Sequence, residues 1–202
     1  LEKRLEKRTV TSGCGQGTVF GDMMEDLDNI KLNAPALRQS SFYRLLKNIR
    51  EYNEVYKKSG AVHGCALCID ENIEKFIEDV GRHNATDAIA GYMLLEEIDG
   101  SDKLFYTTGR LTSEMIIKVA KMGIPILFSR AGITKMGLEL SQKLGVTTIS
   151  RAAGKHFLVY NGADTVIYDA KPKEKTGSRF NTSENSEKSN DDDRRRGAEL
   201  SR

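Results

Sequence analysis

Hydrophobic and polar positions alternate along the middle of the chain with periods that change from segment to segment. Ser40 or Ser41 can cap a first helix, and Gly60 can end it. Between them, apolar residues recur at helical spacing, at Leu45, Ile49, Tyr52 and Tyr56. Two strand-like runs follow, over 61–69 and 73–78, and the polar segment 70–72 between them is typical of a hairpin turn.

The rest of the folded part alternates between strands and helices. Asn84 can cap a helix that runs through Ile89 and Met93 and stops before Gly100. Further helices are predicted over 113–121 and 134–144, and strands over 103–107, 124–128, 146–149, 157–160 and 165–167. Strands that alternate with helices predict a sheet with helices on its faces and largely parallel strands in the middle. We therefore predict an α/β sandwich.

Both ends of the chain differ in pattern from the middle. Residues 1–8 repeat Leu-Glu-Lys-Arg and form a charged lead-in. Residues 171–202 lack apolar periodicity and carry three aspartates followed by three arginines. Such a segment cannot bury enough apolar surface to offset the entropy of ordering, so we predict a disordered tail. One folded domain is expected over 9–170, and the first residue, Leu1, suggests a fragment.

Composition narrows the functional classes. The chain has 202 residues, of which 30% are charged and 39% hydrophobic, with a formal net charge of +2. This composition is typical of a soluble domain. The net charge is too small to predict binding to nucleic acid or to a membrane surface. No apolar run approaches the roughly 20 residues that span a bilayer, and no signal peptide is evident. Three cysteines without framework spacing favour a reducing compartment, so we expect a cytoplasmic protein.

Three predicted strand-to-helix loops each place an arginine beside a small residue. They are Gly81-Arg82-His83-Asn84, Thr108-Gly109-Arg110 and Ser129-Arg130-Ala131-Gly132. Free amides and the positive end of the helix dipole meet there, and arginine adds a planar fork that grips phosphate oxygens. In an open α/β sheet such loops share the edge where ligands usually bind.

The loops therefore favour a ligand with several phosphates, and Lys155-His156 in a later loop adds to them. His83 can serve there as a base, an anion ligand or a hydrogen-bonding residue at a helix start. The alternative interpretation is structural: the arginines pair with neighbouring carboxylates at Asp79, Asp87 and Glu114.

Cys14 lies between glycines in Ser12-Gly13-Cys14-Gly15-Gln16-Gly17. Flanking glycines leave a thiol uncovered and the backbone free to move, which favours a reactive cysteine over an incidental loop thiol. Cys65 and Cys68 form a C-x-x-C after His63, which is compatible with zinc or redox chemistry. Their segment reads as a strand, however, so the two thiols face opposite sides and burial is the favoured interpretation. His63 shares a side with Cys65 and can reach a pocket.

These segments together resemble the formate dehydrogenase accessory sulfurtransferases, the FdhD family. The most specific match is Glu78-Asp79-Val80-Gly81-Arg82-His83-Asn84-Ala85 followed by Asp87. Segments 59–63, 108–114 and 123–127 are also similar, and together the matches span roughly residues 9–168 in order. The resemblance implies a three-layer α/β/α sandwich, a cytidine-deaminase-like mixed sheet that is often dimeric, with a mobile cysteine loop over its pocket.

The resemblance also implies a function. Family members take sulfur from a cysteine desulfurase as a persulfide and pass it to the molybdenum cofactor of formate dehydrogenase. Cys14 falls at the family's loop cysteine. The cofactor there is the bis(guanine dinucleotide) form, whose diphosphates would suit Arg82, His83, Arg110 and Arg130, with His63 nearby. The family's cofactor-binding stretch falls on Ala153, Gly154, Lys155, His156, Phe157 and Leu158.

The chain departs from the family pattern in three places. Cys14 has no second loop cysteine after it, which rules out a two-cysteine relay within the loop. Ala153 and His156 stand where relatives have arginines, and the strands that open family members are missing. Two other functions remain open: a cofactor-binding chaperone of the dehydrogenase without sulfur transfer, and a zinc hydrolase using His63, Cys65 and Cys68. No structural metal is expected, because the H-x-E and P-C-x-x-C motifs of zinc deaminases are absent.

Overall fold

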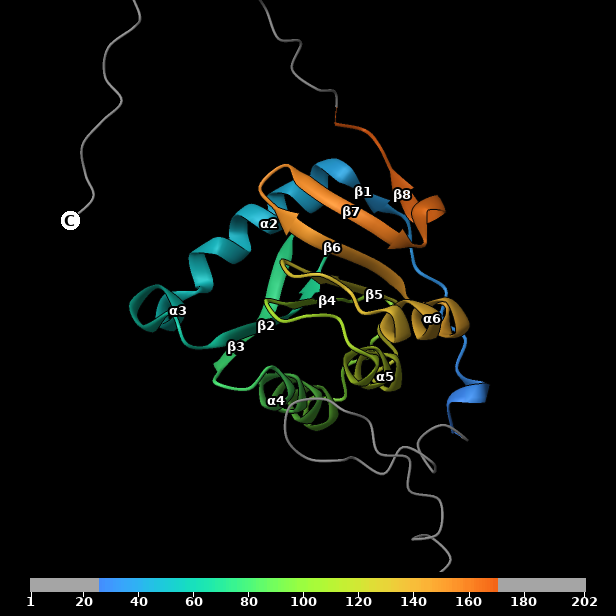
Figure 1. Ribbon diagram of the computed structural model, residues 1–202, viewed down its shortest axis with the longest axis horizontal. Coiled ribbons are helices and arrows are strands. Elements are labelled where there is room, and N and C mark those ends of the chain that lie inside the picture. Colours follow the sequence, from blue (N-terminus) through green and yellow to red (C-terminus); the bar gives the residue numbers. More distant parts are fainter. Residues whose placement is uncertain (1–25, 171–202) are drawn as a thin grey trace, which may run out of the picture. The chain divides into compact units, whose positions relative to one another are not determined.

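The computed structural model describes residues 26–170, and at its centre lies a six-stranded mixed sheet (Figure 1). The strand order is β3-β2-β4-β5-β6-β7, in which β4, β5 and β6 run parallel and the β2–β3 and β6–β7 pairs are antiparallel. The strands are β2 (His63–Ile69), β3 (Asn72–Asp79), β4 (Leu104–Thr107), β5 (Ile126–Ser129), β6 (Thr147–Ala153) and β7 (His156–Asn161). The predicted α/β sheet with a parallel centre is confirmed.

Helices cover both faces of this sheet, which makes the three layers that the family resemblance implied. One face packs against α2, and the other packs against α4, α5 and α6 (Figure 1). The helices are α2 (Gln39–Tyr52), α3 (Glu54–Ser59), α4 (Arg82–Leu95), α5 (Ser113–Lys121) and α6 (Lys135–Leu144). Short 3-10 helices (Asp26–Asn29 and Ala163–Thr165) and a parallel pair of β1 (Leu37–Arg38) and β8 (Val166–Ile167) complete the described part.

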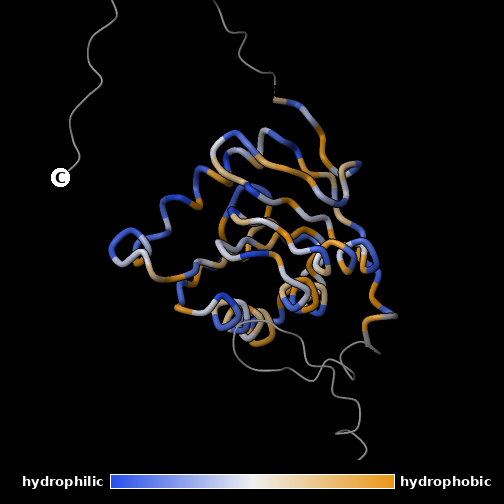
Figure 2. Tube along the Cα trace, viewed as in Figure 1, coloured by the Kyte–Doolittle hydropathy of each residue, from blue (hydrophilic) through white to orange (hydrophobic). Residues whose placement is uncertain are grey.

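Alternation along the central strands separates two hydrophobic cores. In β4, Phe105 points into the core beneath α4 and α5, whereas Leu104 and Tyr106 point into the core beneath α2. Successive side chains of a strand face opposite sides, so a strand buried on both faces must be apolar throughout. Figure 2 shows hydrophobic stretches concentrated in the central strands, while the α3 segment, which has no buried residue, is largely hydrophilic.

The single helix predicted between Ser40 and Gly60 is wrong, because the helix breaks at Asn53 into α2 and α3. Asn53 leaves helical geometry (φ −76°, ψ 62°), and its side-chain nitrogen donates to the Ile49 carbonyl at 3.1 Å. Gly60 does end α3, in the left-handed conformation that glycine favours (φ 66°). The break turns α3 away from the direction of α2.

Two predicted helix caps are also wrong. Helix α2 is preceded by Arg38, and Ser40 lies in its first turn, where its backbone amide and hydroxyl donate to the Asp169 carboxylate at 2.8 Å each. Helix α4 follows Gly81, so Asn84 lies inside its first turn and donates to Asp79 instead. The predicted helix over 113–121 agrees with α5 at both ends.

Three predictions for the chain termini lie outside the described residues: the charged lead-in over 1–8, the Cys14 loop and the tail over 171–202. Within residues 26–170, no helix is long and apolar enough to cross a membrane.

The turn after α6 gives the first testable prediction. Gly145 and Gly154 are both left-handed (φ 74° and 62°), a conformation that costs another residue about 1–2 kcal/mol. A Cβ at Gly145 would lie 2.2 Å from the Leu32 carbonyl oxygen, whereas a Cβ at Gly154 meets nothing within 4 Å. In urea unfolding we expect Gly145→Ala to lower the free energy of unfolding clearly more than Gly154→Ala. Equal losses would show that Leu32 does not pack against this turn in solution.

Candidate functional site

Short polar side chains hold the loops at the carboxyl ends of β4 and β5. The Thr107 hydroxyl accepts a hydrogen bond from the Gly109 amide at 3.1 Å. The Ser129 hydroxyl donates to the Gly109 carbonyl and accepts from the Ala131 amide at 2.9 Å. Both hydroxyls are buried, so each loop begins from a fixed point at the end of its strand. Arg110 and Arg130 follow directly on these points.

The loops after β4 and β5 are also bonded to each other and to the last part of β6. The Leu111 amide donates to the Gly132 carbonyl at 2.9 Å, and the Thr134 amide donates to the Leu111 carbonyl at 3.0 Å. The Arg151 amide, in a residue with positive φ (52°), donates to the Ala131 carbonyl at 3.0 Å. The two loops and the last part of β6, which are distant in sequence, therefore form one connected edge at the ends of the parallel strands, which is where ligands usually bind in such sheets.

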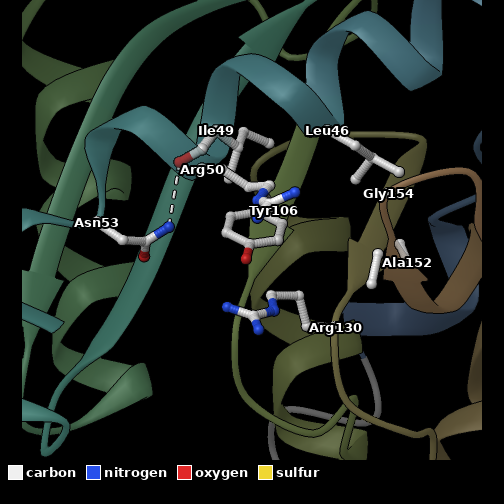
Figure 3. A pocket seen from close by; sticks show the side chains of 9 residues that line it. Leu46, Ile49, Arg50, Asn53, Tyr106, Arg130, Ala152 and Gly154 are labelled. Carbon is white, nitrogen blue, oxygen red and sulfur yellow. Dashed lines mark hydrogen bonds between the residues drawn. The ribbon is translucent and has the colours of Figure 1, made fainter. Parts of the chain in front are cut away.

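Two cavities open at this edge, and Arg130 lines both. The first, of about 370 Å³, lies between α2 and the ends of β4, β5 and β6. The second, of about 470 Å³, lies beside α3 and the start of β2, where its walls include Tyr56, His63 and Thr108. Figure 3 shows the first cavity, whose lining residues are Leu46, Ile49, Arg50, Asn53, Tyr106, Arg130, Ala152, Ala153 and Gly154.

The lining of both cavities is cationic. Arg50 and Arg130 are exposed, and within residues 26–170 neither makes an ion pair with a carboxylate. Among the residues that the structure describes, no aspartate or glutamate lines either cavity. Because like charges gathered without counterions attract anions, the arrangement suits a ligand with phosphate or carboxylate oxygens.

The structural alternative, in which the loop arginines pair with the carboxylates of Asp79, Asp87 and Glu114, is wrong. Asp79 accepts from the Gly81 amide and the Asn84 side chain. Asp87 pairs with Lys118. Glu114 pairs with His83 at 3.1 Å. All three carboxylates therefore have other partners, and the loop arginines are left for other interactions.

His63 lies in the second cavity, as the strand pattern predicted. Its Nδ1 lies 3.1 Å from the Thr108 hydroxyl oxygen, which also accepts from the Gly64 amide at 3.1 Å. Burial lowers the pKa of His63, and the positive charge of Arg82 lowers it further. The ring is therefore neutral at physiological pH and offers its other nitrogen, Nε2, for hydrogen bonding.

Arg82 and His83 lie beside the second cavity rather than in its lining. The Arg82 stem packs over Gly109, where an added Cβ would lie 2.4 Å from Arg82 Cδ. Its buried Nε has no hydrogen-bond partner in the part of the chain that the structure describes. His83 faces α5 through Glu114, and its pKa is lowered by burial and then by the Arg82 charge. Arg110 is exposed and lines neither cavity.

The predicted cofactor stretch 153–158 divides between the cavity and the core. Ala153 and Gly154 line the first cavity. Phe157 instead packs edge-on against the rings of Phe42 and Tyr43, with centroids 5.2 and 5.8 Å away. Lys155, His156 and Leu158 are exposed and line neither cavity. The stretch therefore contributes its turn to the site and its strand to the fold.

Cys65 and Cys68 are buried on opposite faces of β2, as predicted. Cys65 belongs to the core beneath α4 and α5, and Cys68 to the core beneath α2. Strand geometry keeps the two thiols from binding one metal ion, so the zinc site of His63, Cys65 and Cys68 is wrong. Among the described residues, no group of three or more His, Cys, Asp or Glu side chains could hold a metal ion.

Sequence reasoning predicted only Arg130 among the polar side chains of the first cavity and missed Arg50, Asn53 and Tyr106. Arg50 lies on the polar side of a predicted helix, where charged residues are ordinary. Tyr106 lies in an apolar strand, where a tyrosine signals only core packing. A weak signal existed for Asn53, because asparagine is unfavourable inside a helix and often marks a break.

Comparison with known proteins places the chain in a family. The family model described as "FdhD/NarQ family" matches residues 1–167. The chain is 34% identical over 156 residues to the sulfur carrier protein FdhD of Bacillus pumilus, covering 76% of this chain and 59% of the relative. It is 30% identical over 167 residues to the protein of the same name from Bacillus subtilis, covering 82% and 63%.

A solved structure is also similar. It belongs to a candidate formate dehydrogenase accessory protein from Desulfotalea psychrophila, with a TM-score of 0.66 and 31% sequence identity, covering 73% of this chain and 62% of that one. The mixed sheet with helices on both of its faces defines an α/β protein. The chain belongs to the FdhD/NarQ family. It spans about three fifths of the length of the curated relatives that it matches.

Thiol reactivity provides a prediction for the cysteines. Burial raises the pKa of both Cys65 and Cys68, so at neutral pH they are protonated and shielded. In native protein at pH 7.5 (about one unit below a free thiol's pKa), we expect neither to react quickly with a disulfide reagent such as DTNB. Cys14 should therefore account for any rapid reaction, and that reaction should be absent in Cys14→Ala. Both remaining thiols of the variant should react after denaturation. Fast labelling of native Cys14→Ala would contradict the burial of Cys65 and Cys68.

Proposed function

We propose that this chain is the sulfur-carrying part of a formate dehydrogenase accessory protein. In this proposal Cys14 accepts sulfur from a cysteine desulfurase and delivers it to the molybdenum cofactor, in its bis(guanine dinucleotide) form, before insertion into the dehydrogenase. Family membership and relatives named sulfur carrier proteins support the general role. The observation that carries the ligand assignment is the pair of cationic cavities that meet at Arg130.

The ligand chemistry matches the site in two respects. A bis(guanine dinucleotide) cofactor carries two diphosphate groups, and two adjoining cavities offer arginines without competing carboxylates. Arg130 is placed to contact ligand in either cavity, and Arg50 adds a second cation to the first. The apolar wall of Leu46, Ile49 and Ala152 suits the flat face of a base or pterin. His63 presents a neutral ring to the second cavity.

The first half of the sulfur transfer is an exchange that needs no outside oxidant. The Cys14 thiolate attacks the outer sulfur of the desulfurase persulfide, a new sulfur–sulfur bond forms on Cys14, and the desulfurase thiolate leaves. Cys14 then holds a persulfide.

Delivery as sulfide requires two electrons. A second thiol supplies them when it attacks the Cys14 sulfur, forms a mixed disulfide with Cys14 and releases hydrosulfide toward the metal. That thiol has to come from a partner or a small reductant, because Cys65 and Cys68 are buried and the loop has no second cysteine. The proposed partners are therefore a desulfurase, a thiol donor and the dehydrogenase catalytic subunit. We expect a homodimer that works in the cytoplasm.

A second function is a chaperone that binds the cofactor and docks on the dehydrogenase without carrying sulfur. The missing second loop cysteine is the observation that favours it. The two functions share the cavities and differ only in whether Cys14 is loaded, so one experiment on Cys14 separates them.

The test is the intact mass of the protein after incubation with a cysteine desulfurase and cysteine. We expect the wild type to gain one sulfur and the folded Cys14→Ala variant to gain none. Treatment with a thiol reductant should remove the gain, because a persulfide is reducible. No gain in folded wild type would favour the chaperone, and sulfur kept by Cys14→Ala would place the acceptor at Cys65 or Cys68.

A further inference from the structure

The Tyr106 hydroxyl is a buried polar group without a hydrogen-bond partner. Tyr106 lies in β4, is 1% exposed, and packs against the ring of Phe128 with centroids 5.3 Å apart. Its hydroxyl oxygen is covered from solvent and has no hydrogen-bond partner in residues 26–170. Buried hydroxyls are almost always hydrogen-bonded, and leaving one unpaired costs about 1–3 kcal/mol. An exception at the wall of a cavity therefore calls for a functional reason.

The charged side chains beside this hydroxyl are donors and cannot accept its proton. Figure 3 shows the hydroxyl and the Arg130 guanidinium pointing toward each other, while Arg50 lies on the other side of the ring in this view. A guanidinium has five donors and no acceptor, so no arrangement of Arg130 can receive the tyrosine proton. The nearby Asn53 amide nitrogen already donates to Ile49. Asn53 Oδ1 is a buried acceptor without a partner, and it lies against Gly64, where an added Cβ would be 2.9 Å away. The Arg130 and Arg50 guanidinium groups can only donate.

The hydroxyl also keeps its proton. Burial raises the pKa of Tyr106, and the positive charge of Arg130 offsets only part of that rise. The group is therefore a neutral donor throughout the physiological range. Arg130 is exposed and has no carboxylate partner among the described residues, so it can turn toward an anion and uncover the hydroxyl beneath it.

We propose that Tyr106 is a ligand-selecting residue, whose hydroxyl donates to a phosphoryl oxygen of a diphosphate that Arg130 and Arg50 hold in the first cavity. This inference rests on the proposed function and assigns it a residue. A diphosphate brings acceptors only, which matches the two guanidinium groups and the tyrosine hydroxyl, all of which can donate. The ligand supplies the acceptor that the free protein lacks. The Tyr106 hydroxyl therefore lowers the stability of the free protein and raises its affinity for the ligand.

The test uses Tyr106→Phe in the full chain, because this change removes one oxygen and keeps the ring packed in the core. The matched control is Tyr92→Phe, in α4 on the opposite face of the sheet. GDP is the first probe and inorganic pyrophosphate the second, with binding measured by calorimetry and stability by the melting temperature without ligand. We expect Tyr106→Phe to weaken binding of both probes about tenfold, the effect of one hydrogen bond to a charged acceptor. Its melting temperature should be equal to or above that of the wild type.

The outcomes separate this inference from the sulfur-carrier proposal. Equal binding by Tyr106→Phe and wild type, or a loss with GDP but not with pyrophosphate, would overturn the assignment to the phosphoryl oxygen. A clear fall in the melting temperature of free Tyr106→Phe would also overturn it, because the hydroxyl would then have a partner in the free protein. Sulfur loading of Cys14 is read on the same samples. Normal loading with equal binding overturns this inference alone, whereas a wild type that takes up no sulfur overturns the carrier proposal.

Discussion

The double burial of the parallel strands β4, β5 and β6 is the constraint on which the rest of the structure depends. Helices cover both faces, so the strands carry apolar side chains on both sides. Backbone amides need hydrogen-bond partners outside the sheet only beyond the strand ends. There the Thr107 and Ser129 hydroxyls accept from amides of the following loops. The loops with Arg110 and Arg130 therefore begin at the same edge of the sheet.

Arg130 connects the two halves of that edge. It lines the cavity beneath α2 and the cavity beside α3, and its guanidinium lies beside the Tyr106 hydroxyl (Figure 3). A cation shared by two cavities can bind an anionic group of a ligand at the point where the cavities join. The remaining parts of such a ligand can then lie in the two cavities. The break at Asn53 contributes to this geometry, because α2 borders the first cavity and α3, after the break, borders the second.

Several features of the fold and site could be predicted because they depend on neighbours in sequence. The hairpin around 70–72, the bounds of α5 and the opposite orientation of Cys65 and Cys68 follow from local periodicity. The cap of α2 could not be predicted in this way, because the carboxylate of Asp169 reaches Ser40 from the other end of the domain. Any residue with a small polar side chain near a helix start looks like a cap until such a partner is known.

By itself, the sequence determined the alternation of strands and helices, the arginine-bearing loops at the strand ends, and the resemblance to the FdhD/NarQ family. Periodicity, loop composition and motif order depend on neighbouring residues, so each can be recognised without knowing how the chain packs. Only the tertiary structure decided that Arg50 from α2 and Tyr106 from β4 join Arg130 around one cavity. Their positions in sequence are those of an ordinary surface arginine and an ordinary core tyrosine. Their shared role depends on which side chains from distant segments meet, and on which of their polar groups the packing leaves without a partner.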